Sequence, residues 1–169
     1  MGICSGALTL LAYRCKRNIQ LDCYYLFIVS IMNSQFYIQT ASGTGHFIGI
    51  GRMDPPFSGI LETVTEAGKE AFTYDSSGNL MTVAGHLYVT YDRATKKLKI
   101  LPQEKDPVRW NVVYGTGARG SRIQGSSSNE FWTVSSSSKE VGTPIRLEQE
   151  QDNGSPYQAW RFIPTSQYV

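Results

Sequence analysis

The side chains best suited to ligand chemistry gather near the C-terminus, between Trp132 and Gln158. This stretch combines carboxylates, amides and aromatic rings, and its candidate binding residues are Trp132, Thr133, Glu148, Asp152, Asn153, Tyr157 and Gln158. Carboxylates and amides can hydrogen-bond neighbouring hydroxyls, and Tyr or Trp can stack on a flat apolar face. The stretch therefore predicts a candidate site for a ligand that carries several hydroxyl groups.

A plainer interpretation of the same stretch stays open and is the favoured one. The segment "QDNGSP" at 151–156 contains Asn-Gly and Ser-Pro, which are strong turn dipeptides. It also contains the sequon Asn153-Gly154-Ser155, which matters only in a secreted chain and is weakened by the proline that follows. The polar residues can thus form a solvated turn without any ligand.

Catalytic arrangements find little support in the sequence. Glu148 and Asp152 form the nearest carboxylate pair, but they belong to the charged segment "EQEQD", which is typical of a solvated face. His46 and His86 each follow a glycine at positions that the pattern predicts to be equivalent, which favours a structural role at strand starts. Gly-x-Ser-x-Gly, Walker A and His-Glu-x-x-His motifs are absent from the sequence. We therefore expect no enzymatic activity and no cofactor.

Composition narrows the remaining classes of partner and site. The chain has 169 residues, a formal net charge of +2 and 18% charged residues, so we expect no nucleic-acid partner. Its three cysteines all lie within the first 23 residues, and it has two histidines and no Cys-x-x-Cys pair. We therefore expect neither a disulfide framework nor a metal site in the main domain.

The first 33 residues differ from the rest and are predicted to be an extension outside the domain. Arg14, Lys16 and Arg17 form a basic patch ahead of an apolar run at 23–32, which is about half the roughly 20 residues of a spanning helix. An unusual signal peptide and a non-native upstream segment with Met32 as the true start are both open. Membrane contact is expected only if the apolar run is retained, and the compartment, cytoplasmic or secreted, depends on the same point.

The sequence from residue 34 to 167 predicts a single all-β domain. Segments of four to six residues with alternating polarity, such as "HFIGI", "KLKIL" and "FWTV", are bounded by Gly, Ser, Asn, Asp or Pro. We expect roughly a dozen short strands.

An internal repeat organises these strands into three units. Phe72, Trp110 and Trp160 each open a strand after a polar loop, and "GHFIGI", "GHLYVT" and "NEFWTV" form a second set of markers. Both sets recur about every 40 to 50 residues, which predicts repeats over 34–76, 77–116 and 117–167. Since one short repeat cannot bury its apolar stripe alone, we expect the three aromatic residues to meet in a shared core.

The pattern resembles the β-trefoil fold and, within it, the ricin B-type lectin family with its Gln-x-Trp (QxW) repeats. The resemblance covers residues 36–164, and the third repeat keeps a complete motif in Gln158-Ala159-Trp160. It implies a lectin-like, carbohydrate-binding module whose partner is a glycan or a glycoprotein.

The sugar-binding positions that this resemblance implies are substituted in every repeat. The family's aspartate position falls on Gly49 or Ile50, Thr90, and Thr133 in turn, and its aromatic platform falls on Glu62 or Thr63, Leu101, and Glu148. The Asn-Gln pair before the tryptophan falls on Lys69-Glu70, Pro107-Val108 and Tyr157-Gln158. The resemblance therefore implies sugar sites that are non-standard or partly lost.

A proline-rich loop carries the alternative function. The segment "GRMDPPFSG" includes Met53, Asp54, Pro55, Pro56 and Phe57, and its two prolines would stiffen an exposed loop and reduce the entropy lost on binding. Since trefoils also serve as protease inhibitors, the alternative partner is a protease or another protein.

Overall fold

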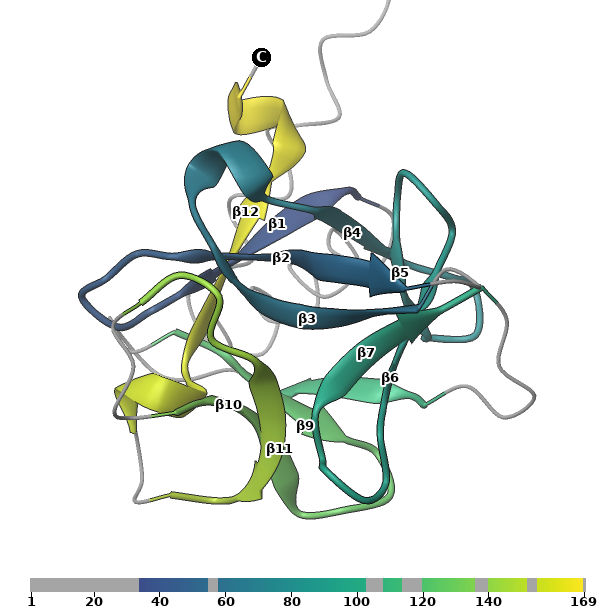
Figure 1. Ribbon diagram of the computed structural model, residues 1–169, viewed down its shortest axis with the longest axis vertical. Helices are drawn as coiled ribbons and strands as arrows, with labels where there is room; N and C mark the ends of the chain where they lie inside the picture. The colour runs from purple at the N-terminus through teal and green to yellow at the C-terminus, as the bar shows by residue number, and fades with distance from the viewer. Residues whose placement is uncertain are drawn as a thin grey trace, which may run out of the picture.

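The computed structural model describes residues 34–54, 58–102, 108–113, 120–135, 140–151 and 155–168, and over these residues the chain forms twelve strands in three sets of four (Figure 1). The first set is β1 (Phe36–Thr40), β2 (Phe47–Asp54), β3 (Ser58–Val64) and β4 (Ala71–Tyr74). The second is β5 (Leu80–Thr82), β6 (Tyr88–Tyr91), β7 (Leu98–Leu101) and β8 (Trp110–Val113). The third is β9 (Arg122–Gly125), β10 (Glu130–Val134), β11 (Ile145–Gln149) and β12 (Trp160–Pro164).

Three short 3-10 turns complete the described structure. They are η1 (Glu66–Gly68), η2 (Pro156–Gln158) and η3 (Thr165–Tyr168). The first and second turns lead into β4 and β12, the strands that carry Phe72 and Trp160. The all-β class expected from the alternating pattern is confirmed, and in strands such as β1, β4 and β7 burial alternates along the strand.

The first and last strand of every set join into a ring. Antiparallel pairing connects β12 to β1, β1 to β4, β4 to β5, and β8 to β9. Isolated bridges close the remaining gaps, from Asn79 to Arg109 between the β5 and β8 ends and from Ser121 to Trp160 between the β9 and β12 ends. The ring therefore has no free edge, which removes a site for edge-to-edge aggregation.

The two middle strands of each set form hairpins that cap one end of the ring. The pairs are β2 with β3, β6 with β7, and β10 with β11. Strand β3 pairs with β7 through Gly59 and Ile100, and single bridges join Glu62 to Pro144 and Lys97 to Arg146. The three hairpins thus contact one another around the axis, and no repeat is a separate unit.

The shared core is a continuous set of aromatic and aliphatic side chains. Phe72, Trp110 and Trp160 are all buried there. Trp132 lies between the two tryptophans, with edge-on ring contacts of 5.3 Å to Trp110 and 6.2 Å to Trp160 between centroids. Such T-shaped pairs add stabilisation beyond the area they bury, so the core holds the third repeat against the second.

The indole N–H groups explain why two of the repeats favour tryptophan. Trp110 Nε1 donates to Val89 O at 2.9 Å, and Trp160 Nε1 donates to Trp132 O at 3.2 Å. In the first repeat Phe72 has no such donor, and the backbone N–H of Glu70 donates to Ile48 O at 3.1 Å. The backbone carbonyls of Ile48, Val89 and Trp132 therefore each accept a hydrogen bond, as buried backbone groups require.

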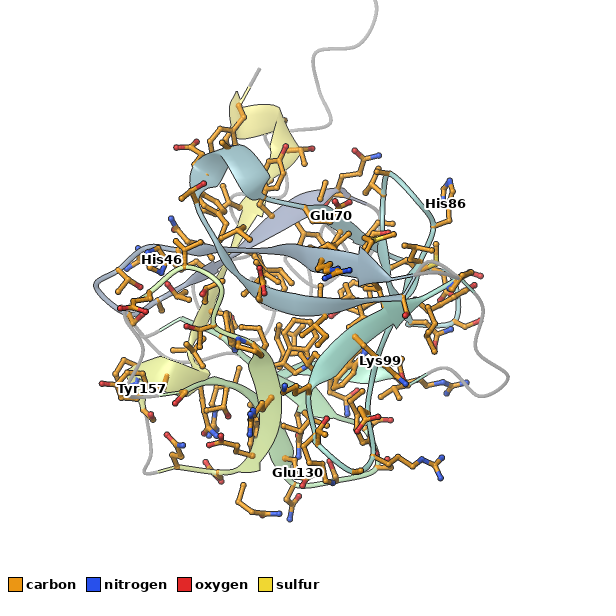
Figure 2. The ribbon with its side chains drawn as sticks, viewed as in Figure 1. His46, Glu70, His86, Lys99, Glu130 and Tyr157 are labelled. Atoms are coloured by element: carbon orange, nitrogen blue, oxygen red, sulfur yellow. The ribbon has the colours of Figure 1, made fainter. Side chains whose placement is uncertain are left out.

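The register corrects the expected equivalence of the two histidines. The N–H of Thr40 donates to His46 O, and in the second repeat the N–H of Thr82 donates to Leu87 O, so His46 corresponds to Leu87. His86 instead takes the left-handed position that Gly45 takes in the first repeat, with φ of 50° and 61° respectively. The two imidazoles lie on opposite flanks of the molecule (Figure 2).

The C-terminal turn packs on the first repeat through a lysine enclosed by aromatic rings. Lys69 Nζ lies 3.3 Å from the ring centroid of Tyr168 and 4.6 Å from that of Tyr37, and it pairs with Glu66 at 3.1 Å. In Figure 1, η3 accordingly lies beside η1. Cation–π contacts of this kind hold the end of β12 against the barrel.

Candidate functional site

The strand register identifies the corresponding positions in the three repeats. Strands β2, β6 and β10 begin to pair at Phe47, Tyr88 and Phe131, which face Gln39, Met81 and Gln124. The aspartate position therefore falls on Gly49, Thr90 and Thr133. The platform position falls on the partners of Phe47, Tyr88 and Phe131, which are Val64, Leu101 and Glu148. In the first repeat this replaces the expected Glu62 or Thr63 by Val64.

The first repeat has no room for a ligand at this position. A Cβ added to Gly49 would lie 2.5 Å from Gly68 O and 2.7 Å from Val64 Cγ2. The turn η1 and the Val64 side chain therefore occupy the space where a binding side chain would stand. Glu70 takes the place of the motif glutamine, and burial raises the pKa of its carboxyl while a hydrogen bond from the Ala84 backbone opposes that shift.

The second repeat lacks polar groups at the same place. Thr90 is buried and Leu101 is half-buried and apolar. Neither offers the carboxylate or amide oxygens that hold neighbouring hydroxyls. The loop at 103–107, which precedes the motif position Val108, lies outside the described residues.

In the third repeat Gln158 anchors the loop instead of facing solvent. It is 0% exposed, and its Nε2 donates to Thr133 Oγ1 and to Gln149 O, each at 2.9 Å. Its Oε1 accepts from the N–H of Gln151 at 2.9 Å. One amide thus joins β10, the end of β11 and η2, which explains why a glutamine stands two residues before Trp160.

Burial removes Trp132, Thr133 and Gln158 from direct ligand contact, against the expectation from sequence. Trp132 is 0% exposed in the core, and Thr133 is 1% exposed, with its hydroxyl donating to Phe131 O at 3.0 Å while it accepts from Gln158. Trp132 and Thr133 are neighbours on β10, so alternation along a strand would place one of the two side chains on the outer face. Neither side chain is exposed, because the loop that Gln158 anchors covers the outer face of the strand.

The exposed polar groups of the third repeat lie around Glu148 and Tyr157. Gln151 Nε2 donates to Glu148 Oε2 at 2.9 Å, and Ser155 Oγ donates to Gln151 Oε1 at 3.1 Å. Tyr157 is half-buried on η2, whose first turn is capped by the Ser155 side chain. Asp152 and Asn153 lie outside the described residues.

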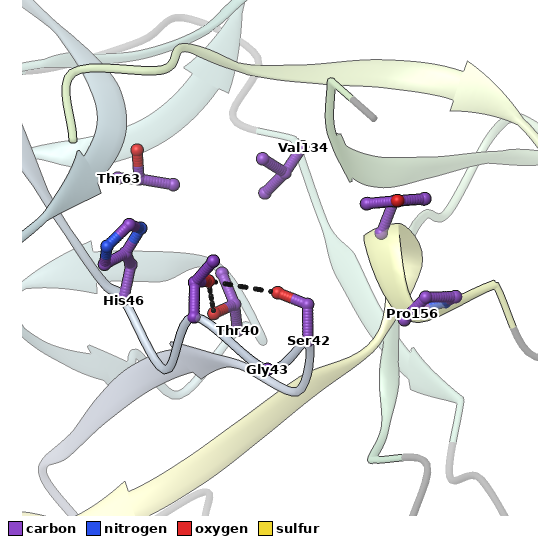
Figure 3. A pocket seen from close by; sticks show the side chains of 9 residues that line it. Thr40, Ser42, Gly43, His46, Thr63, Val134 and Pro156 are labelled. Atoms are coloured by element: carbon purple, nitrogen blue, oxygen red, sulfur yellow. Dashed lines mark hydrogen bonds between the residues drawn. The ribbon is translucent and has the colours of Figure 1, made fainter. Parts of the chain in front are cut away.

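A pocket of about 390 Å³ opens beside Tyr157, between the first and third repeats (Figure 3). The end of β1 supplies Thr40, the β1–β2 loop supplies Ser42, Thr44 and His46, and η2 supplies Pro156 and Tyr157. Figure 2 shows His46 and Tyr157 on the same flank of the molecule. Sequence reasoning missed the loop side of this pocket, because "TASGTGH" has only the composition of a polar turn.

The described residues contain no group of three or more His, Cys, Asp or Glu side chains that could hold a metal ion. In the same ranges, no helix is both long enough and apolar enough to cross a membrane.

Comparison with solved structures decides the fold. The C-terminal half of an earthworm R-type lectin in complex with GalNAc superimposes with a TM-score of 0.60 at 16% identity, over 78% of this chain and 98% of that one. This chain is a β-trefoil. The Macrolepiota procera ricin B-like lectin in complex with lactose matches this β-trefoil with a TM-score of 0.60 at 15% identity, over 76% of this chain and 94% of that one.

Structure comparison finds further matches to the fold, whereas sequence comparison finds none. A designed threefold-symmetric protein, ThreeFoil, gives a TM-score of 0.62 at 13% identity over 76% of this β-trefoil and 97% of its own chain. No protein-family profile matches the chain, and no curated protein sequence matches it. At such low identity the likeness establishes the fold, and function has to be argued from the side chains.

Proposed function

We propose that this β-trefoil is a non-catalytic, lectin-like module that binds carbohydrate through non-standard contacts in its third repeat. Two of the solved structures that share its fold are lectins described in complex with GalNAc and with lactose. The first and second repeats offer a filled site and an apolar one, so the third repeat carries the proposal.

The observation that carries the proposal is the position of Tyr157 at the rim of a pocket whose lining includes several hydroxyl groups. Its ring is half-buried at the rim of a pocket, and its hydroxyl makes no hydrogen bond to the described part of the chain. Glu148 uses Oε2 to bind Gln151, and in the same described part its Oε1 has no partner. A ring to stack on and polar side chains in the same repeat are groups that a sugar can use.

We also propose that the protein has no catalytic activity, because of how the carboxylates of the third repeat are placed and paired. Glycoside hydrolysis needs two carboxyl groups about 5 to 9.5 Å apart across a bound sugar. Near Glu148, the carboxylate of Glu150 is paired with the Arg122 guanidinium. Neither acid lines the pocket beside Tyr157. This supports binding without bond cleavage.

A glycan array probed with the full chain tests the proposal. We expect retention of at least one glycan, and loss of that signal in Tyr157→Ala. Tyr168→Ala is the matched control, because Tyr168 is exposed and lies on η3, outside the pocket. A folded wild-type chain that retains no glycan on the array, and none in calorimetry at millimolar sugar, would refute carbohydrate binding.

A second candidate function, binding to a protease or another protein, is favoured by the first hairpin. Strands β2 and β3 have eight and seven residues, against four each in β6 and β7, and Met53 and Ile60 are 42% and 38% exposed. Asp54 ends β2, and Pro55, Pro56 and Phe57 lie outside the described residues.

Inhibition assays against serine and cysteine proteases separate this candidate from the first. Inhibition that is lost in Met53→Ser and kept in Tyr157→Ala would support it. Lack of inhibition across the panel would count against a protease partner.

A further inference from the structure

The pocket between the first and third repeats is distinct from the sugar-binding positions that the ricin B-type pattern implies. Its described lining includes none of Thr133, Glu148 and Gln158. It is formed where the β1–β2 loop meets η2, so it exists only because the ring brings the start of the domain beside its end. A volume of about 390 Å³ falls within the range of roughly 300–1,000 Å³ that is typical of small-molecule sites.

Charge restricts what this pocket can hold. Its described lining contains no Asp, Glu, Lys or Arg. An anion would be expected to meet Arg or Lys, and a cation would be expected to meet carboxylates. The described lining therefore matches a neutral ligand better than a charged one.

The hydrogen-bonding groups of the lining are of the kind that both donate and accept. The hydroxyls of Thr40, Thr44 and Ser42 form a chain with oxygen separations of 3.3 and 3.2 Å (Figure 3). Each hydroxyl has one donor and two acceptor sites, so this chain keeps unused capacity. The imidazole of His46 and the hydroxyl of Tyr157 make no hydrogen bond with the described residues. The groups best matched to such a lining are hydroxyls on the ligand, since they also donate and accept.

Apart from Thr63, the rest of the described lining outside the β1–β2 loop and Thr40 is apolar and lies across the pocket from that loop. Val134, at the end of β10, and Pro156, on η2, contribute it together with the ring of Tyr157 (Figure 3). The Thr63 hydroxyl is already engaged, since it donates to Glu140 O at 2.9 Å and accepts from the Thr143 N–H at 3.0 Å. The pocket thus has a hydroxyl-rich side and an apolar side.

We propose that this inter-repeat pocket binds one neutral pyranose ring, that is, a single uncharged sugar unit. The C–H face of the ring packs on Tyr157, Pro156 and Val134, and its hydroxyls bind His46 and the hydroxyls of Ser42 and Thr44. This inference deepens the proposed carbohydrate binding and rests on it, because it states where the sugar lies relative to Tyr157 and which sugars are accepted.

Amide NMR titration of the full chain with neutral monosaccharides, and with a sialic acid as the charged comparison, locates the sugar. We expect shifts at 40–46 and at Tyr157 with neutral sugars, and none there with the sialic acid. Thr44→Val should weaken binding about 3- to 10-fold, which is the value of one hydrogen bond. Tyr157→Ala, which removes the ring on which the sugar packs, should weaken binding further. Tyr168→Phe is the matched control, because Tyr168 is exposed on η3 and does not line the pocket, and it should bind as the wild type does.

Each contrary outcome has a separate meaning. Shifts confined to 148–151, together with lost binding in Glu148→Gln and normal binding in Thr44→Val, would overturn the pocket and leave carbohydrate binding intact. A folded wild-type chain without any shift would overturn both. The same spectra report whether each variant is folded, and Thr44 is exposed, so its substitution should leave the core unchanged.

Discussion

The amide of Gln158 and the hydroxyl of Thr133 bind each other, with Nε2 and Oγ1 2.9 Å apart and both side chains buried. These are two of the positions that the QxW pattern assigns to sugar recognition. In this chain the third repeat uses them to fasten η2 to β10. The proposed carbohydrate binding therefore rests on residues such as Tyr157 that the fastened loop presents.

Replacing Gln158 by alanine should destabilise the fold and not merely weaken binding. The change leaves Gln149 O and the Gln151 N–H without their partner, and unsatisfied buried groups cost about 1–3 kcal/mol each. We expect the free energy of unfolding in urea to fall by about 3 kcal/mol. Gln149→Ala, which removes an exposed side chain, should change it by less than ~0.5 kcal/mol. Equal midpoints for the two variants would contradict the anchoring role.

Trp132 should behave as a core residue. Trp132→Ala removes a fully buried ring between Trp110 and Trp160, and such changes cost about 3–5 kcal/mol. Trp132→Phe should cost less, because Trp132 Nε1 has no hydrogen-bond partner among the described residues and only packing is lost. Calorimetry on the phenylalanine variant should show unchanged glycan binding. A folded Trp132→Phe protein that no longer binds glycan would place this ring in the site.

The first repeat's filled position can be tested with two glycines. An alanine at Gly49 would meet Gly68 O at 2.5 Å, and overpacking of this kind costs about 1–3 kcal/mol. An alanine at Gly43 meets nothing within 4 Å, so thermal unfolding of that variant should match or slightly exceed the wild type. If Gly49→Ala were as stable as Gly43→Ala, the space beside Gly49 would be open.

Glu70→Gln should stabilise the protein at neutral pH and restore a Gln-x-aromatic sequence in the first repeat. Burial raises the pKa of Glu70, so the ionised form is less favourable in the folded state than in the unfolded state. The wild type should lose stability as pH rises from the ordinary glutamate pKa through the raised folded value. Glutamine keeps an oxygen acceptor for the Ala84 N–H and does not titrate. The urea midpoints of the wild type and of Glu70→Gln should move apart as the pH rises. Parallel curves of midpoint against pH would contradict the effect of burial on Glu70.

Sequence alone was sufficient to predict the all-β class, the threefold organisation and the buried position of the QxW aromatics. Alternating polarity and a recurring aromatic marker are local patterns, and they survive even when most motif residues have changed. Phe72 shows this, because an aromatic ring is kept although the indole N–H is lost, and the backbone of Glu70 supplies the missing hydrogen bond.

The location of the candidate site was decided only by tertiary structure. Alternation along β10 shows that Trp132 and Thr133 face opposite ways, but it cannot show that the loop fastened by Gln158 covers the outer one. The pocket beside Tyr157 joins residues near 40–46 to residues near 156, and no local pattern connects segments so far apart in the sequence. Closure of the barrel by β1 and β12 places them side by side. Sequence fixes which side chains the chain carries, and ring closure determines which of them share a surface.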